Sequence, residues 1–306
     1  MATATVALDD SRRQRRGQIY VALAAVAWSS AGVLQRQLSL DTATQVAGRA
    51  AFAGLSLLLY VAFVERGRLV RGFRSVGLAG VGVALCIAVA SGGFIAALNQ
   101  TSVARVLFIL AIAPVLAALL ARVFLGEPIS RRTAVAMAIA LAGVTLMLGA
   151  PGDGNATGDG IALLMAFAFA LSIVITRHRR DVSMAPATCL SQVILLAVFV
   201  PFASAGEITG GDVVWLALLG AGQIGLGLVL MMAGARLIPA AQVALITLLE
   251  VVLGPLWVWI AVSEQPDTAT LVGGAIVIAA IVIQTLGAPA EEAQEPAREA
   301  AVPPPP

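Results

Sequence analysis

Residues 238–262 read IPAAQVALITLLEVVLGPLWVWIAV, an apolar run in which Glu250 is the one ionisable side chain. As an α-helix rising about 1.5 Å per residue, this run is long enough to cross the ~30 Å hydrocarbon core of a bilayer. A carboxylate at the bilayer centre costs roughly 2.5–3.5 kcal/mol on insertion scales, so such a group usually faces protein or a water-filled cavity. We therefore predict a membrane-spanning helix with an inward-facing acid.

The same pattern occurs once earlier in the chain. The apolar run 101–125 is closed by Glu127 and Pro128, and the later run is closed by Glu264 and Pro266, with the two glutamates 137 positions apart. Each run is followed by a further apolar helix, at 133–148 and at 268–286. The chain therefore consists of two copies of one membrane unit.

Composition agrees with a membrane-embedded chain. Of 306 residues, 59% are hydrophobic and 12% are charged, whereas soluble domains carry about 25% charged residues. All 19 basic residues are arginine, which is typical of a GC-rich genome, and we expect a multi-pass protein of the bacterial inner (cell) membrane. Breaks between the apolar segments predict spans at 17–35, 45–64, 76–98, 102–125, 131–149, 159–177, 186–205, 213–235, 238–262 and 268–287.

Arginine distribution sets the expected orientation. Arginines fill every second loop, at 12–16, 66–74, 131–132, 177–180 and 236, whereas the loops between them are mainly acidic. The positive-inside rule then places both termini in the cytoplasm, which requires an even number of spans. Because each copy has five spans, the second copy must be inverted relative to the first. Inverted repeats are typical of secondary transporters, which bind solute near the midplane between the halves and work by alternating access.

We therefore predict an all-α integral membrane protein of ten transmembrane helices in two inverted five-helix repeats. The expected parts are a cytoplasmic basic tail (1–16), the first repeat (17–149), an external linker (150–158), the second repeat (159–287) and a disordered cytoplasmic tail (288–306).

Four short motifs carry a family resemblance. They are WSSAG at 28–32, Arg49 within GRAAFAGL, LGEPIS at 125–130 and SEQP at 263–266. In order and spacing, residues 17–287 resemble the ten-helix EamA-type members of the drug/metabolite transporter superfamily. The resemblance implies a secondary transporter, often an exporter of amino acids or other small metabolites, and it leaves the substrate open.

Glu250 is the first candidate for the substrate site. It corresponds to Ala113 in the first copy, so the acid belongs to the second half alone. One interpretation is a cavity-lining group that binds a substrate cation or a coupling proton. The alternative is a permanent structural pair with an arginine.

Further candidates are polar or aromatic residues within the spans. Arg49 and Arg105 suit bidentate binding of a carboxylate, or snorkelling toward the interface. Amides supply donors and acceptors for a zwitterion, and they also join helices; those considered are Gln192, Gln223 and Gln242. Gln242 lies eight residues before Glu250, which predicts a shared helix face. Trp28 is expected as a cavity wall or an interface anchor.

Two features are expected to be structural. Pro114 and Pro255 predict kinks in the fourth and ninth spans. Glu127 is expected to shape its loop, or to pair with Arg131 or Arg132.

The chain has no phosphate-binding loop, metal-ligand spacing or nucleophile–base pair, so we expect no catalytic residues, metal, cofactor or nucleic-acid partner. The expected substrate is a small polar or zwitterionic metabolite, with a nucleotide-sugar or lipid-linked sugar as the rival class. An integral membrane enzyme acting on lipid-linked substrates and a receptor or channel subunit are the alternatives from other classes. The sequence leaves open the direction of transport, coupling to protons and formation of a homodimer.

Overall fold

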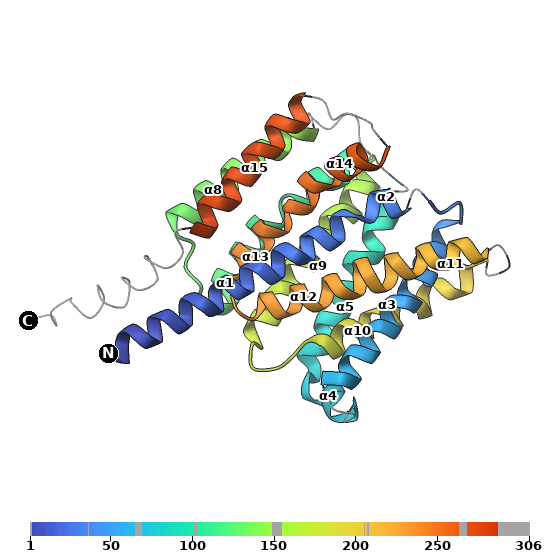
Figure 1. Cartoon of the computed structure of the whole chain (residues 1–306), viewed down its shortest axis with the longest axis horizontal. Coiled ribbons are helices and arrows are strands. Elements are labelled where there is room, and N and C mark those ends of the chain that lie inside the picture. Colours follow the sequence, from blue (N-terminus) through green and yellow to red (C-terminus); the bar gives the residue numbers. More distant parts are fainter. Residues whose placement is uncertain are drawn as a thin grey trace, which may run out of the picture.

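The computed structural model describes residues 2–35, 37–64, 69–98, 100, 103–148, 155–204, 206, 208–262 and 268–286. Within these residues every regular element is a helix, as Figure 1 shows. Nine helical segments of the described part are long and apolar enough to cross a membrane. The remaining predicted span, the first, is helical as well but is interrupted at Ser30, between α1 (Ala2–Ser29) and α2 (Ala31–Gln35). The predicted all-helical membrane fold is confirmed.

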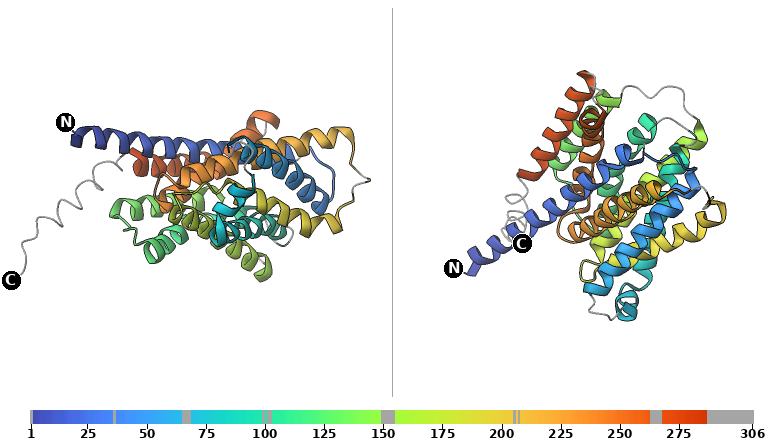
Figure 2. Two further views of the ribbon diagram at one scale, coloured as in Figure 1. Left: turned by 90° about the horizontal axis from the view of Figure 1, so that it is seen from below. Right: turned by 45° about the vertical axis from the view of Figure 1, so that its right-hand side comes forward.

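The other helices follow the predicted spans closely. In the first half they are α3 (Thr42–Val64), α4 (Leu69–Ser75), α5 (Gly77–Leu98), α6 (Val103–Leu110), α7 (Ala113–Leu125) and α8 (Arg131–Leu148). In the second half they are α9 (Ala156–His178), α10 (Ala185–Phe199), the 3-10 turn η1 (Val200–Phe202), α11 (Gly210–Ala217), the π-helix η3 (Leu218–Gly225), α12 (Leu226–Ala235), α13 (Ala240–Thr247), α14 (Leu249–Val262) and α15 (Thr268–Leu286). The basic tail predicted at 1–16 is helical from Ala2, and α1 projects beyond the bundle in Figure 2.

The fourth and ninth spans are interrupted at equivalent positions. The first interruption contains Ala111 and the second is at Leu248, which lies 137 positions later. Pro114 lies in the first turn of α7, where its missing N–H is tolerated, so the break in the fourth span falls beside the proline for which a kink was predicted. Pro255 lies inside α14, well after the second interruption, so the break in the ninth span is not at the proline. Each half therefore has a divided fourth helix.

Equivalent helices of the two halves make equivalent packing contacts. α1 packs on α12 as α9 packs on α5, and α3 packs on η3 as α10 packs on α5. α8 and α15, the last helices of the two halves, lie side by side in Figure 1. Their backbones meet at glycines: a Cβ on Gly273 would lie 2.5 Å from the carbonyl oxygen of Gly143. Small residues permit this close approach between helices in lipid.

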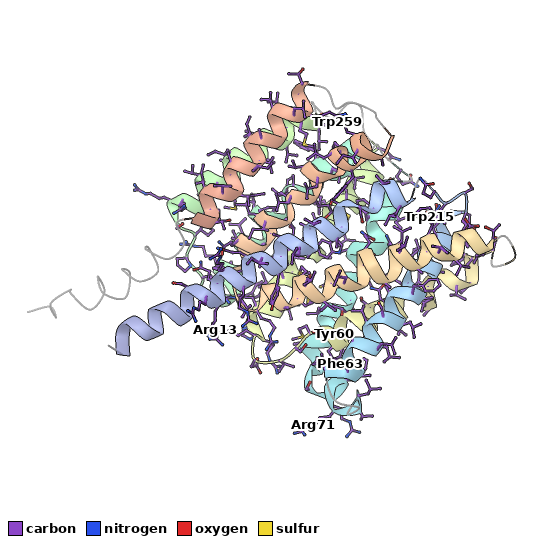
Figure 3. The ribbon with its side chains drawn as sticks, in the orientation of Figure 1. Arg13, Tyr60, Phe63, Arg71, Trp215 and Trp259 are labelled. Carbon is purple, nitrogen blue, oxygen red and sulfur yellow. The ribbon has the colours of Figure 1, made fainter. Side chains whose placement is uncertain are left out.

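The two ends of the bundle differ in their side chains. Figure 3 shows Arg13 at the left and Arg71 at the bottom of the bundle, whereas Trp259 lies near its top and Trp215 at its right. We call the end with Arg13 and Arg71 the arginine end; α3, α7 and α9 finish there.

Candidate functional site

A cavity of about 140 Å³ lies between the two halves. Most of its wall is apolar, and the side chains that contribute a polar atom or charge are Trp28, Arg49, Ser91, Gln192, Gln223, Thr247 and Glu250. These residues come from α1, α3 and α5 of the first half and from α10, η3, α13 and α14 of the second. We call this the central cavity.

Arg49 supplies the positive charge of the central cavity. It lies in the second turn of α3, toward the end of that helix opposite the arginine end. Its Nη2 donates to Ser91 Oγ at 3.1 Å, which ties the guanidinium to α5. An arginine carries five N–H donors in a planar fork, so this single bond leaves donors for a bound carboxylate.

Glu250 supplies the negative charge. It lies in the first turn of α14, immediately after the interruption at Leu248. A carboxylate is favoured in the first turn of a helix because the backbone N–H groups there point toward it. Among the described residues, neither Glu250 nor Arg49 belongs to an ion pair. The two ionisable residues thus line one cavity and form no ion pair with each other.

Two residues that line the same cavity each carry a buried polar atom without a partner among the described residues. Gln223 donates from Nε2 to the carbonyl oxygen of Trp28 at 3.4 Å, and its Oε1 accepts no hydrogen bond from the described residues. The indole Nε1–H of Trp28 likewise has no partner among them, although the residue is buried. An unsatisfied buried polar group costs roughly 1–3 kcal/mol, so water or a ligand is expected to meet Gln223 Oε1. Trp28 Nε1 lies against α12, where a Cβ on Gly227 would be 2.1 Å from it. The Trp28 ring packs edge-on against Phe169, with ring centroids 6.0 Å apart.

The structure brings five of the seven candidate residues together, namely Trp28, Arg49, Gln192, Gln223 and Glu250. Gln192 is buried and donates from Nε2 to Ser191 Oγ at 3.0 Å. Gln242 lines a different cavity. The continuous helix face expected for Gln242 and Glu250 is absent because the helix is interrupted at Leu248, between the two residues. The side chain of Arg105 lies outside the described part of the chain.

Sequence reasoning missed Ser91, Thr247 and the two phenylalanines of the wall, Phe94 and Phe169. Thr247 could have been predicted from the internal repeat. Thr247 and Leu110 are repeat equivalents, as are Glu250 and Ala113, and all four line the central cavity. The equivalent turns of both divided helices therefore face the same space.

Gln223 is placed by an unusual helix. It lies in the π-helix η3, a form that occurs mostly as short insertions in α-helices and frequently at functional sites. η3 packs on α3 at Gly220, where a Cβ would lie 2.5 Å from the carbonyl oxygen of Arg49. A glycine at this position thus brings the backbone that carries Arg49 beside the one that carries Gln223.

A two-part helical bundle with a charged cavity between its halves is the architecture of a membrane transporter. The model of the EamA-like transporter family matches residues 15–149 and again residues 156–286. The chain belongs to this family, within the drug/metabolite transporter superfamily.

A solved structure titled "Crystal structure of protein" is similar in fold. It has 18% sequence identity and a TM-score of 0.76, and the match covers 88% of this chain and 96% of that one. No curated protein matched the sequence.

Proposed function

We propose that this protein is a secondary transporter that exports a small zwitterion with an apolar body, similar to an amino acid, by alternating access. The observation that carries the proposal is that Arg49 and Glu250 line one cavity without forming an ion pair with each other. The two residues are the charged groups among those that line it, so its wall has one positive and one negative site. A molecule with a carboxylate and an ammonium group matches both.

Each part of such a molecule has a counterpart in the cavity. The guanidinium of Arg49 would bind the carboxylate in bidentate fashion. Glu250 would hold the ammonium group, or a coupling proton when the solute is absent. The apolar body would lie against Trp28, Phe169 and Met231. Because the charges come from different halves, a rocking motion of one half against the other would change both contacts together.

The rival substrate class fits this cavity less well. A nucleotide-sugar or a lipid-linked sugar carries a phosphate-rich group, which calls for several cations and more space. The central cavity has a volume of about 140 Å³ and one arginine. We further propose that the halves are inverted, that both termini are cytoplasmic and that the protein works in a bacterial inner membrane. The arginine distribution supports this orientation.

Counterflow in proteoliposomes tests the proposal. Purified protein shown to be folded is reconstituted with an unlabelled amino acid inside, and uptake of the same radiolabelled amino acid is followed for leucine, phenylalanine and glutamine in turn. We expect saturable uptake of at least one of the three. Absence of counterflow for all of them would reject this substrate class.

Glu250→Gln tests proton coupling. If Glu250 carries the coupling proton, the glutamine variant retains exchange but loses its dependence on pH between about pH 5 and 8, because an amide cannot take up a proton there. Rates of exchange measured across this range for both proteins check the prediction. A pH profile unchanged from that of the wild type would exclude the role.

Asp41→Asn is the matched control for this measurement. Asp41 lies just before α3 and accepts hydrogen bonds from the side chain and backbone of Thr44, which lower the pKa of this carboxyl below its ordinary value. Asp41 therefore stays ionised down to more acidic pH than an ordinary aspartate, and its neutralisation should leave the pH profile of exchange unchanged.

A further inference from the structure

A second cavity, of about 190 Å³, lies at the arginine end of the bundle. Its walls come from both halves: α1, α7, the segment 127–130 and α8 of the first half, and α9, Pro239, α13 and α15 of the second. Charged and polar side chains reach it, in contrast to the mostly apolar wall of the central cavity. We call it the inner cavity.

The inner cavity contains buried amides without partners. Gln242 is 1% exposed, and neither its Nε2 nor its Oε1 forms a hydrogen bond with the described residues. Gln284 donates from Nε2 to Thr133 Oγ1 at 3.1 Å, which fixes its amide, and its Oε1 is also unpartnered in the described part of the chain. One donor and two acceptors thus await a ligand. Buried polar atoms are nearly always hydrogen-bonded, so the lack of a partner for these three atoms needs an explanation.

The inner cavity and the central cavity lie one after the other along α7 and α13. Thr247 and Ala244 of α13 line the central cavity, and Ala241 and Gln242 of the same helix line the inner cavity. On α7, likewise, Ala113 faces the central cavity and Ala118 and Ala121 face the inner one. At about 1.5 Å per residue, less than two helical turns separate the two spaces. α7 and α13 pack on each other, and the small side chain of Ala117 lies buried in the packed core.

An ion pair joins the halves beside the inner cavity. Glu127 Oε1 accepts from Arg177 Nε at 2.8 Å, and Glu127 Oε2 accepts from the backbone N–H of Ala240 at 3.3 Å. Arg177 Nη1 also donates to the carbonyl oxygen of Arg236 at 3.1 Å. Glu127 therefore pairs with α9 of the second half, rather than with a neighbouring arginine of its own loop as the sequence suggested. These contacts join the C-terminal end of α7 to three helices of the other half, namely the ends of α9 and α12 and the start of α13.

We propose that the inner cavity is a second solute-binding position, on the cytoplasmic side of the route, and that the Glu127–Arg177 pair is the latch that closes it. The inference rests on the proposed transport function. The amide oxygens of Gln242 and Gln284 would accept from the ammonium group of an amino acid, and Gln242 Nε2 would donate to its carboxylate. When the latch parts, solute enters here first and then passes between α7 and α13 to Arg49 and Glu250.

Gln242→Leu tests the binding position. Leucine has a similar size and removes both unpartnered atoms, so thermal stability should stay the same or rise. With leucine as the transported probe, we expect the half-saturation concentration from the cytoplasmic face, measured in everted vesicles, to rise about tenfold, as for the loss of one to two hydrogen bonds. The value from the opposite face, measured in right-side-out vesicles, should not change.

Gln192→Leu is the matched control, because Gln192 is also 1% exposed but lines the central cavity. It should raise the half-saturation concentration from both faces. For Gln242→Leu, an equal rise from both faces, or no change from either, would overturn the proposal.

Thiol labelling tests the latch without any transport measurement. In a protein with Cys86→Ala and Cys189→Ala, Ala121→Cys places a thiol in the wall of the inner cavity. We expect a membrane-impermeant maleimide to label it from the cytoplasmic face about tenfold faster when Glu127→Gln is added. A rate that Glu127→Gln leaves unchanged would overturn the latch. If the Ala121→Cys protein labels as expected but the wild-type protein gives no counterflow with any amino acid, the proposed substrate is rejected and the latch stands.

Discussion

Arg49→Gln is expected to lower amino-acid counterflow by about 100-fold. The guanidinium is the single cation among the residues that line the central cavity, and its contact with a carboxylate would be a charge-assisted, bidentate one. Hydrogen bonds to charged groups contribute about 1.5–3 kcal/mol, and each 1.4 kcal/mol is a factor of ten in affinity. Initial rates at a solute concentration below half-saturation, in proteoliposomes that contain equal amounts of folded protein, measure the loss.

Two further variants separate charge from geometry. Arg49→Lys retains the charge but not the planar fork, so we expect an intermediate loss of about tenfold. Arg122→Gln removes an arginine from an exposed position in the last turn of α7, and its rate should remain within about twofold of the wild type. An unchanged rate for Arg49→Gln, or an equal loss for Arg122→Gln, would contradict the assigned role.

Gly220→Ala is expected to have the largest effect on stability. A Cβ at this position would lie 2.5 Å from both the carbonyl oxygen of Arg49 and the Cβ of Phe52, and 2.9 Å from the backbone nitrogen of Ala53. Since two of these atoms belong to the backbone of α3, the added methyl group cannot be accommodated by rotating one side chain. Overpacking of this kind costs about 1–3 kcal/mol. Separation of α3 from η3 would also move Arg49 away from Gln223, so transport should fall together with the thermal unfolding midpoint.

Gly222→Ala is the matched control within the same π-helix. A Cβ on Gly222 would meet no atom within 4 Å, and the residue is exposed. Alanine is favoured over glycine in helices by about 0.5–1 kcal/mol, so this variant should be as stable as the wild type or slightly more so. If the two alanine variants unfolded at the same temperature, close packing at Gly220 would not be what holds α3 to η3.

The spans were predictable because their signal is local. In lipid each backbone N–H and C=O group must form its hydrogen bond within its own helix, so a span appears in the sequence as one uninterrupted apolar run. This holds even where the helix is divided: the runs that contain Ala111 and Leu248 remain apolar throughout, and so the sequence shows the span but conceals the break. Pro114 marks one break, whereas Pro255 lies well after the other.

The candidate site was predictable in part for a similar reason. Ionisable and amide groups are rare in apolar runs, so Arg49, Gln223 and Glu250 stand out by type alone. Gln242 stands out equally well, yet it lines the inner cavity, because the interruption at Leu248 breaks the helical register that links it to Glu250. Ser91 gives no such signal, since serine is common where helices pack closely in membranes.

By itself the sequence determined the helical membrane fold, its division into two repeats and the kinds of polar group available inside it. These properties depend on each residue and its near neighbours along one helix. Only the tertiary structure decided which polar groups meet: that Arg49 and Glu250 face one cavity, and that Glu127 pairs with Arg177. Such partners lie far apart in the chain, and they come together through the packing of several helices at once, which no single run of residues encodes.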